Sequence, residues 1–242
     1  MAWRDQRTRN ERAQRPPVLS IEEPTGQALA DAAGLIGRTW YPDEPEARRG
    51  ACEKIELAHH LKHATYVRAA MLGNRFAGIV AAAPTELHRH PKPGNVSALW
   101  YRDHMRAVAP WAEKTSDGAA IGVALAPITA EMALTQELLE SQDDRAAWEV
   151  TLLIVDPACH GKGVGKALFM GALDYLSHQG APGFFLATDD GCDFGFYDHL
   201  GLERIAEREA PGCTAPLAGH HDKGPFHVYL YGARLGDESD VR

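Results

Sequence analysis

An apolar segment that runs into a glycine-rich turn is the feature that most constrains the fold. Residues 148–155 are apolar and β-branched, which predicts a buried strand. Gly161, Gly163 and Gly165 then alternate across the start of residues 164–179, whose apolar positions have helical spacing. Because glycine loses more conformational entropy on folding than any other residue, three glycines at one connection indicate a ligand that approaches the backbone closely.

The ligand that suits such a turn is a phosphate or a pyrophosphate. The first turn of a helix leaves N–H groups without intrahelical partners, and the helix dipole adds partial positive charge there. Two common phosphate loops are excluded by spacing. A P-loop fails because Ala167 follows Gly165-Lys166, and a dinucleotide fingerprint fails because Lys166 stands at its third glycine position. A tight strand–helix turn without a ligand is the alternative interpretation.

One loop pattern does fit, [Gln/Arg]-x-x-Gly-x-[Gly/Ala], over residues 160–165. This stretch resembles the loop of the GNAT superfamily of acetyl-CoA-dependent N-acetyltransferases, with His160 in place of the usual Gln or Arg. Residues 148–157 resemble the central splayed strand of that family, 184–188 its diverging neighbour, and 196–202 its Phe-Tyr-x-x-Leu-Gly-Phe signature. The motifs cover residues 148–209, and a weaker fit covers 18–83.

The resemblance implies an α/β (α+β) class and a GNAT fold. We expect a mixed, mostly antiparallel sheet with splayed central strands, flanked by helices, and a helical insertion at about 84–147 before the central strand. That insertion and the glycine loop also resemble the puromycin N-acetyltransferase type. The pattern predicts strands at 18–21, 65–72, 76–83, 148–155, 184–188, 202–208 and 226–231, and helices at 28–40, 45–63, 97–109, 129–140, 164–179 and 194–200.

The domain organisation follows from composition along the chain. Residues 1–17 are Arg-rich with little apolar content and predict a disordered basic tail, with a transit peptide as the alternative. Residues 18–235 form the acetyltransferase domain, and residues 236–242 an acidic tail.

The resemblance also implies which residues bind the coenzyme. In the family, the backbone of the splayed strand holds the pantetheine arm, and a strand N–H faces the thioester oxygen. The glycine loop binds the pyrophosphate, and many members place an Asn that contacts the coenzyme four residues before the signature tyrosine. Carried onto this sequence, the cofactor-binding residues are Leu153, Ile154, Val155, His160, Gly161, Lys162, Gly163, Val164, Gly165, Lys166 and Asp193. For Lys162, exposure to solvent without a ligand is the alternative.

Two residues match catalytic positions of the family. Tyr197 matches the tyrosine that donates a proton to the departing thiolate, and aromatic packing of the short helix is the alternative. Glu149 matches a position that serves as the general base in some members. A carboxylate in an otherwise apolar strand is costly unless it is partnered, whereas a glutamate at a surface end of the strand is the alternative.

The net charge and the cysteine content limit which binding partners and which cellular location we expect. The 242 residues carry a net charge of −8, which repels nucleic acid and attracts protonated amines. No stretch approaches the ~18–20 apolar residues of a membrane-spanning helix, so we expect no membrane partner. The four cysteines form no CxxC pair, which indicates reduced thiols and a cytoplasmic location. The histidine groups at 59–63 and 220–221 lack metal-ligand spacing, so we expect no metal.

The function that we expect is acetyl transfer from acetyl-CoA, as cosubstrate, to a primary amine of a small molecule by direct attack in a ternary complex. An acidic patch is expected to attract the cation; it comprises Glu131, Glu137, Glu140, Asp143 and Asp144. Acetylation of a protein or peptide and a non-catalytic coenzyme-A-binding regulator are the alternatives. The sequence leaves open whether the chain forms a homodimer.

Overall fold

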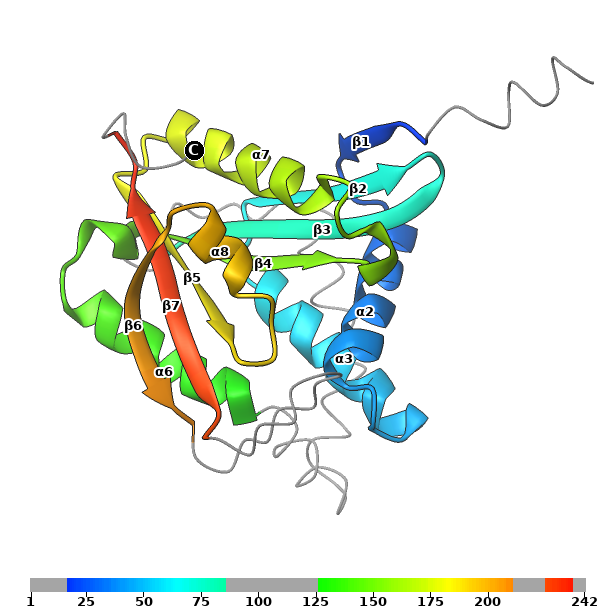
Figure 1. Ribbon diagram of the computed structural model, residues 1–242, viewed down its shortest axis with the longest axis horizontal. Helices are drawn as coiled ribbons and strands as arrows, with labels where there is room; N and C mark the ends of the chain where they lie inside the picture. The colour runs from blue at the N-terminus through cyan, green and yellow to red at the C-terminus, as the bar shows by residue number, and fades with distance from the viewer. Residues whose placement is uncertain (1–16, 86–125, 211–224, 237–242) are drawn as a thin grey trace, which may run out of the picture.

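A seven-stranded sheet is the frame of the molecule in the computed structural model, which describes residues 17–85, 126–210 and 225–236 (Figure 1). The strand order is β1-β2-β3-β4-β5-β7-β6, and every neighbouring pair is antiparallel except β4 and β5, which are parallel. The strands are β1 (Leu19–Glu22), β2 (Tyr66–Leu72), β3 (Arg75–Pro84), β4 (Trp148–Val155), β5 (Gly183–Asp189), β6 (Glu203–Glu209) and β7 (His227–Arg234). The mixed, mostly antiparallel sheet predicted from the sequence is confirmed.

Helices cover both faces of this sheet. One face packs against α7 (Val164–His178) and α8 (Gly195–His199), and the other against α2 (Gly26–Trp40), α3 (Glu46–Leu61) and α6 (Ala126–Glu140). The strands alternate accordingly, since the rings of Tyr229 and Tyr231 join the α7 core while Val228 and Leu230 join the α6 core. We call the second face the α3/α6 face.

Strand β4 changes its register halfway along its length. Leu152 pairs with Ala81 of β3, whereas Glu149 pairs with Ala83, so two residues of β4 lie opposite the single residue Ala82. This is a β-bulge, and it interrupts the regular alternation of side chains between the two faces of the sheet. As a result Val150 faces α7 whereas Leu152 faces α2 and α3, although the two are only two positions apart.

The two parallel strands at the centre separate almost at once. Among the described residues, the only register pair between β4 and β5 is Glu149 with Phe185. Beyond that pair the backbone edge of β4 that faces away from β3 has no neighbouring strand in the described part of the chain (Figure 1). We call this gap the split between β4 and β5, and it corresponds to the splayed central strands expected from the sequence.

Helix α6 buries only part of its apolar surface. Met132, which helical spacing places on one face with Gln136 and Leu139, is 56% exposed. The buried residues are Leu134 and Leu138, which are four apart and pack against β5 and β7. The expected helix at 97–109, most of the insertion and the two tails lie outside the described residues.

Candidate active site

The glycine-rich turn joins the end of β4 to the start of α7. A short 3-10 helix, η3 (Pro157–Cys159), follows the strand, and Gly163 then serves as the N-cap residue of α7. Gly161 and Gly163 have φ angles of 71° and 76°, which disfavour any other residue. A Cβ atom built at either position would meet nothing within 4 Å, so the space beside the turn is open.

The geometry of this turn suits an anionic ligand. No side chain caps α7, and within the described residues no hydrogen bond engages the N–H groups of Val164, Gly165 and Lys166. The side chain of Lys166 is exposed, whereas the Lys162 ammonium donates to the Ala158 carbonyl at 2.8 Å. The predicted phosphate loop therefore has free backbone donors at a helix N-terminus.

A salt bridge fixes the start of this loop. Asp156 accepts a hydrogen bond from the Ala158 N–H at 2.9 Å and from the Arg75 guanidinium at 2.7 Å. Partial burial would raise the pKa of Asp156, but the contacts with Arg75 and the backbone outweigh it and lower the pKa. The loop is thus tied to the hairpin between β2 and β3.

Along β4, the backbone N–H and C=O groups of successive residues point alternately toward β3 and toward the split. The Asp156 N–H donates to the Ala77 carbonyl of β3 at 2.9 Å, and antiparallel ladders alternate between bonded and non-bonded positions. Ile154 therefore directs its backbone groups to β3, while Leu153 and Val155 direct theirs toward the split. The His160 Nε2 lies 3.3 Å from the Val155 carbonyl, which agrees with this orientation.

Glu149 lies on the α3/α6 face at the base of the split. Its partner Phe185 packs against α6, so the two side chains share that face. Burial raises the pKa of Glu149 from its ordinary value of 4.5 to about 7, and the nearby charge of His60 opposes the rise. No hydrogen bond or ion pair of the described residues holds this carboxylate. It titrates near neutral pH, as a general base should.

Three further acids were not expected as a group; they influence one another, and one of them, Glu131, also influences Glu149. Burial and the charges of the other acids raise the pKa of Glu131 on α6, and burial raises that of Asp189, at the end of β5, to about 6. Glu56 of α3 is 5% exposed and contributes to both shifts. We call Glu56, Glu131, Glu149 and Asp189 the carboxylate cluster. Because neighbouring acids disfavour one another's ionised forms, a cation bound among them would be favoured.

Only Glu131 of the predicted acidic patch belongs to this cluster. The Glu137 carboxylate binds the guanidinium of Arg208, and Asp143 binds that of Arg145. Those two acids therefore stabilise the fold. The remaining acids of the patch, Glu140 and Asp144, are exposed.

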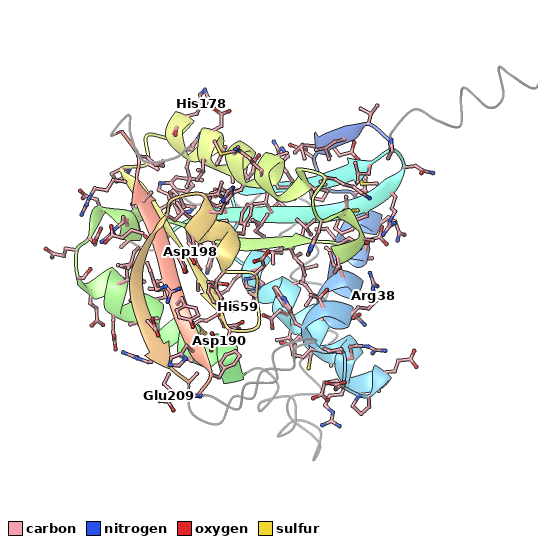
Figure 2. The ribbon with its side chains drawn as sticks, in the orientation of Figure 1. Arg38, His59, His178, Asp190, Asp198 and Glu209 are labelled. Atoms are coloured by element: carbon pink, nitrogen blue, oxygen red, sulfur yellow. The ribbon has the colours of Figure 1, made fainter. Side chains whose placement is uncertain are left out.

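Tyr197 is 9% exposed and lies in α8, on the opposite face from the carboxylate cluster. Its ring contacts those of Phe169 and Tyr231 at centroid distances of 6.0 and 5.7 Å. Burial raises the pKa of its hydroxyl, with smaller contributions from Cys192 and Asp193, so the group is protonated at neutral pH. Its hydroxyl has no hydrogen-bond partner among the described residues, whereas the Tyr231 hydroxyl donates at 2.8 Å to Asp198, a residue labelled in Figure 2. Asp193 itself is exposed.

Sequence reasoning missed the contribution of α3. Within the described part of the chain no three acidic, histidine or cysteine side chains are arranged to hold a metal. His60 instead contacts Glu56 and influences Glu149, a relationship that only the folded chain brings together.

No described helix is long and apolar enough to span a membrane. The described cysteines, Cys52, Cys159 and Cys192, form no disulfide.

Solved structures with this architecture are numerous. A polyamine N-acetyltransferase of Drosophila melanogaster superposes with a TM-score of 0.54 and 15% identity, over 90% of this chain and 100% of that one. The ribosomal-protein-S18-alanine N-acetyltransferase from Escherichia coli gives 0.51 and 12%, over 93% and 100%. A mosquito arylalkylamine N-acetyltransferase like 5b gives 0.50 and 18%, over 90% and 100%. At such low sequence identities, the structural similarity establishes a shared fold and nothing more.

The family itself is shown by sequence. A model of the acetyltransferase (GNAT) family matches residues 81–201, which is half of the chain. That span contains the split strand, the glycine loop and the Tyr197 helix described above. The chain therefore belongs to the GNAT family of acetyl-CoA-dependent N-acetyltransferases.

Proposed function

We propose that this acyltransferase moves the acetyl group of acetyl-CoA to a primary amine of a small, cationic molecule. The observation that carries the proposal is the carboxylate cluster, which brings acids from α3, α6 and β5 to the face of the sheet that holds the candidate base. A protonated amine neutralises such a site, whereas an acidic acceptor is repelled. One structural neighbour is named for polyamines and another for agmatine, which are both cationic amines.

The glycine loop supports binding of the cosubstrate. The N–H groups of Val164, Gly165 and Lys166 would hold the pyrophosphate, and the backbone of Leu153 and Val155 would hold the pantetheine arm along the split. The open space beside Gly161 and Gly163 fits this role, because any side chain there would fill it. A role of Asp193 in coenzyme binding is weakly supported, because an exposed carboxylate repels phosphate.

The chemistry follows from the ionisation of two residues. Glu149, with a pKa of about 7, takes a proton from the acceptor ammonium and leaves the neutral amine. The amine nitrogen attacks the thioester carbonyl, so a C–N bond forms and the C–S bond breaks. Glu149 releases this first proton to solvent and then takes the second proton from the nitrogen of the tetrahedral intermediate. Tyr197 donates its hydroxyl proton to the departing thiolate and regains a proton from solvent, so one proton is released overall. Attack is direct, with both substrates bound together.

The test is a thiol-release assay with acetyl-CoA over a panel of amines. The panel contains polyamines, agmatine, arylalkylamines, aminonucleosides, aminoglycosides, amino acids and a peptide with a free N-terminus. Turnover of small cationic amines, with at least tenfold higher kcat/KM than the peptide, is the expected result. Preference for the peptide would make the chain a protein acetyltransferase. Binding of acetyl-CoA without turnover of any amine would make it a coenzyme-A-binding regulator.

The remaining expectations accompany this proposal. Free cysteines and the use of acetyl-CoA support a cytoplasmic location, and the net charge of −8 is unfavourable for nucleic-acid binding. Fractionation of the native cells and the elution volume of the purified chain would test location and the possible homodimer.

A further inference from the structure

A polar groove separates helix α2 from the turn between β2 and β3. Its volume is about 480 Å³, within the roughly 300–1,000 Å³ of typical small-molecule sites. It lies on the α3/α6 face of the sheet, because its lining residue Phe76 belongs to the core beneath α2 and α3. Helix α7, which follows the glycine loop, packs on the other face. The groove is therefore distinct from the site expected for the coenzyme.

One wall of the groove is a row of α2 residues with an arginine at its end. Ala30, Gly34 and Arg38 are four positions apart and so lie on one side of the helix. The guanidinium of Arg38, a residue labelled in Figure 2, folds back over Gly34, where an added Cβ atom would lie 3.2 Å from the Arg38 Nη1. Glycine weakens the interior of a helix relative to alanine, so the space that Gly34 leaves for this guanidinium accounts for its presence there.

The charged groups of the groove balance, but one of them has unused donors. Asp156 binds the Arg75 guanidinium at 2.7 Å, and Asp31 accepts a hydrogen bond from the Gln27 amide at 2.9 Å. Arg38 makes no hydrogen bond or ion pair with any residue that the structure describes. The groove thus combines zero net charge with a free guanidinium.

A carboxylate suits this guanidinium better than a more highly charged anion does. A guanidinium presents two parallel N–H donors that match the two oxygens of a carboxylate. The Asn74 side chain adds an amide donor on the opposite wall. A phosphate dianion would bring a second negative charge beside Asp31 and Asp156, which the neutral groove does not compensate. Asp31 lies seven residues from Arg38, about 10 Å along the helix axis, and can accept hydrogen bonds from hydroxyl groups at the far end of a ligand.

We propose that the groove between α2 and the β2–β3 turn binds a small hydroxylated carboxylate, with its carboxylate on Arg38 and its hydroxyl groups on Asp31. The inference does not depend on the proposed acetyl transfer, since neither residue contributes to the carboxylate cluster, the split or the glycine loop. The groove and the glycine loop share the ion pair between Arg75 and Asp156. A ligand in the groove therefore borders the coenzyme site without entering it.

The experiment titrates the ¹⁵N-labelled, ligand-free full chain with gluconate at constant ionic strength and follows the arginine Nε–H signals by NMR. The Arg38→Gln variant assigns the Arg38 signal. Gluconate should move that signal to a saturating value, because the guanidinium exchanges water for a carboxylate. Sorbitol, which keeps the hydroxyl groups and lacks the carboxylate, is the matched neutral probe and should leave the signal unmoved.

Gly34→Leu is the variant that fills the groove. Leucine favours a helix, and its side chain would take the space beside the Arg38 guanidinium, so the affinity for gluconate should fall by about tenfold or more. The matched control is Gly50→Leu, within α3, where an added Cβ atom would meet nothing within 4 Å; its affinity should stay within about twofold of the wild type. If Gly34→Leu does not fold, calorimetry with Arg38→Gln, against Arg48→Gln on α3, makes the same comparison.

The outcomes that contradict the inference are specific. It is overturned by an Arg38 signal that does not saturate, by an equal shift with sorbitol, or by full affinity in a folded Gly34→Leu chain. Tighter binding of inorganic phosphate than of gluconate would overturn the assignment of a carboxylate. If acetyl-CoA moves the Arg38 signal and abolishes the response to gluconate, the groove holds part of the coenzyme and is not a separate site. Because binding is measured without turnover, failure of the proposed acetyl transfer would leave this test unaffected.

Discussion

Thr151 and His60 are joined by a hydrogen bond of 2.9 Å between the threonine hydroxyl and the histidine carbonyl, and this bond links a sheet bulge to the end of α3. The bulge turns Thr151 and Glu149 toward α3 and α6. The α3 helix in turn brings Glu56 and His60 to the same place. The base of the split is therefore fixed by the strand and the helix together, and each step of the proposed chemistry can be tested separately.

Gly163→Val tests the phosphate loop. The φ of 76° at Gly163 costs a side chain roughly 1–2 kcal/mol, and the new side chain occupies the space expected for the pyrophosphate. Acetyl-CoA should raise the Tm of the wild type, as any ligand of the native state does, but not that of the variant.

Gly180→Val is the matched control for this change. Gly180 lies at the other end of α7 and has a φ of 71°, and a Cβ atom added there would also meet nothing within 4 Å. The control should lose similar stability yet keep the acetyl-CoA-induced rise in Tm. If both variants keep that rise, the coenzyme binds somewhere other than the glycine loop.

Glu149→Gln tests the general base. With a pKa of about 7, Glu149 is ionised only as the pH rises through neutrality, so wild-type kcat/KM should climb across that range. The variant should lose that acid limb and about 10²-fold or more in kcat, with little change in acetyl-CoA affinity. Glu140→Gln, which changes an exposed acid on α6, is the control and should be unaffected. Wild-type turnover across the pH range in Glu149→Gln would assign the base to another group.

The same shift has a consequence for stability. The folded state holds the Glu149 proton more tightly than the unfolded chain does, because the pKa rises from 4.5 to about 7. Stability contributed by this group is therefore present below pH 4.5 and is lost as the pH rises toward 7. Melting curves should show the wild-type Tm falling more across this window than that of Glu149→Gln. Parallel Tm curves would mean that Glu149 is solvated.

The sequence predicted the order and type of the described elements because their apolar periodicity is strong. Residues 148–155 read as a buried strand, and the glycines that follow read as a phosphate turn; both lie where expected. Which side of α6 packs against the sheet was not predicted, because its apolar residues do not form a single stripe: Met132 is 56% exposed, whereas Leu134 and Leu138 are buried.

The carboxylate cluster was beyond sequence reasoning for a different reason. Glu56, Glu131 and Asp189 lie on three elements far apart in the chain, and only the strand order brings them around Glu149. The bulge at Thr151 carries no sequence signal of its own, yet it decides which side chains face α3. The site therefore depends on long-range pairing that periodicity does not report.

Tyr197→Phe tests the proton donor. The change keeps the ring, which packs among Phe169 and Tyr231, and removes a hydroxyl that has no described partner. Stability and acetyl-CoA affinity should survive, while kcat falls by about 10²-fold, the low end for general acid catalysis, because a thiolate leaves readily.

Tyr231→Phe is the contrasting variant. Its hydroxyl donates to Asp198 and accepts from Arg204, so its loss should lower the Tm and leave kcat per folded molecule unchanged. If Tyr197→Phe behaves in the same way, Tyr197 is a packing residue, and water must protonate the departing sulfur.

Asp143→Asn tests the ion pair between Asp143 and Arg145. From the sequence, Asp143 was assigned to the acidic patch, and its role in this ion pair was not predicted. Arg145 is 8% exposed, and its guanidinium binds Asp143 at 2.6 and 3.0 Å and Glu203 at 2.6 Å. Removing the Asp143 charge leaves this buried cation with one partner, so the free energy of unfolding at pH 7 should fall by about 3 kcal/mol. Asp144→Asn, at the exposed neighbouring position, should change it by less than about 0.5 kcal/mol.

The pH dependence of stability shows whether Asp143 stabilises the fold through its charge. Hydrogen bonds from Arg145 lower the pKa of Asp143 from 3.8 to about 2. The folded state therefore favours the ionised form, and the stability that results is present above pH 3.8 and lost as the pH falls toward 2. In urea titrations the difference between wild type and Asp143→Asn should shrink over that window. A difference that persists at pH 2 would trace the effect to the side-chain cap that Asp143 provides for the Arg145 N–H, and not to its charge.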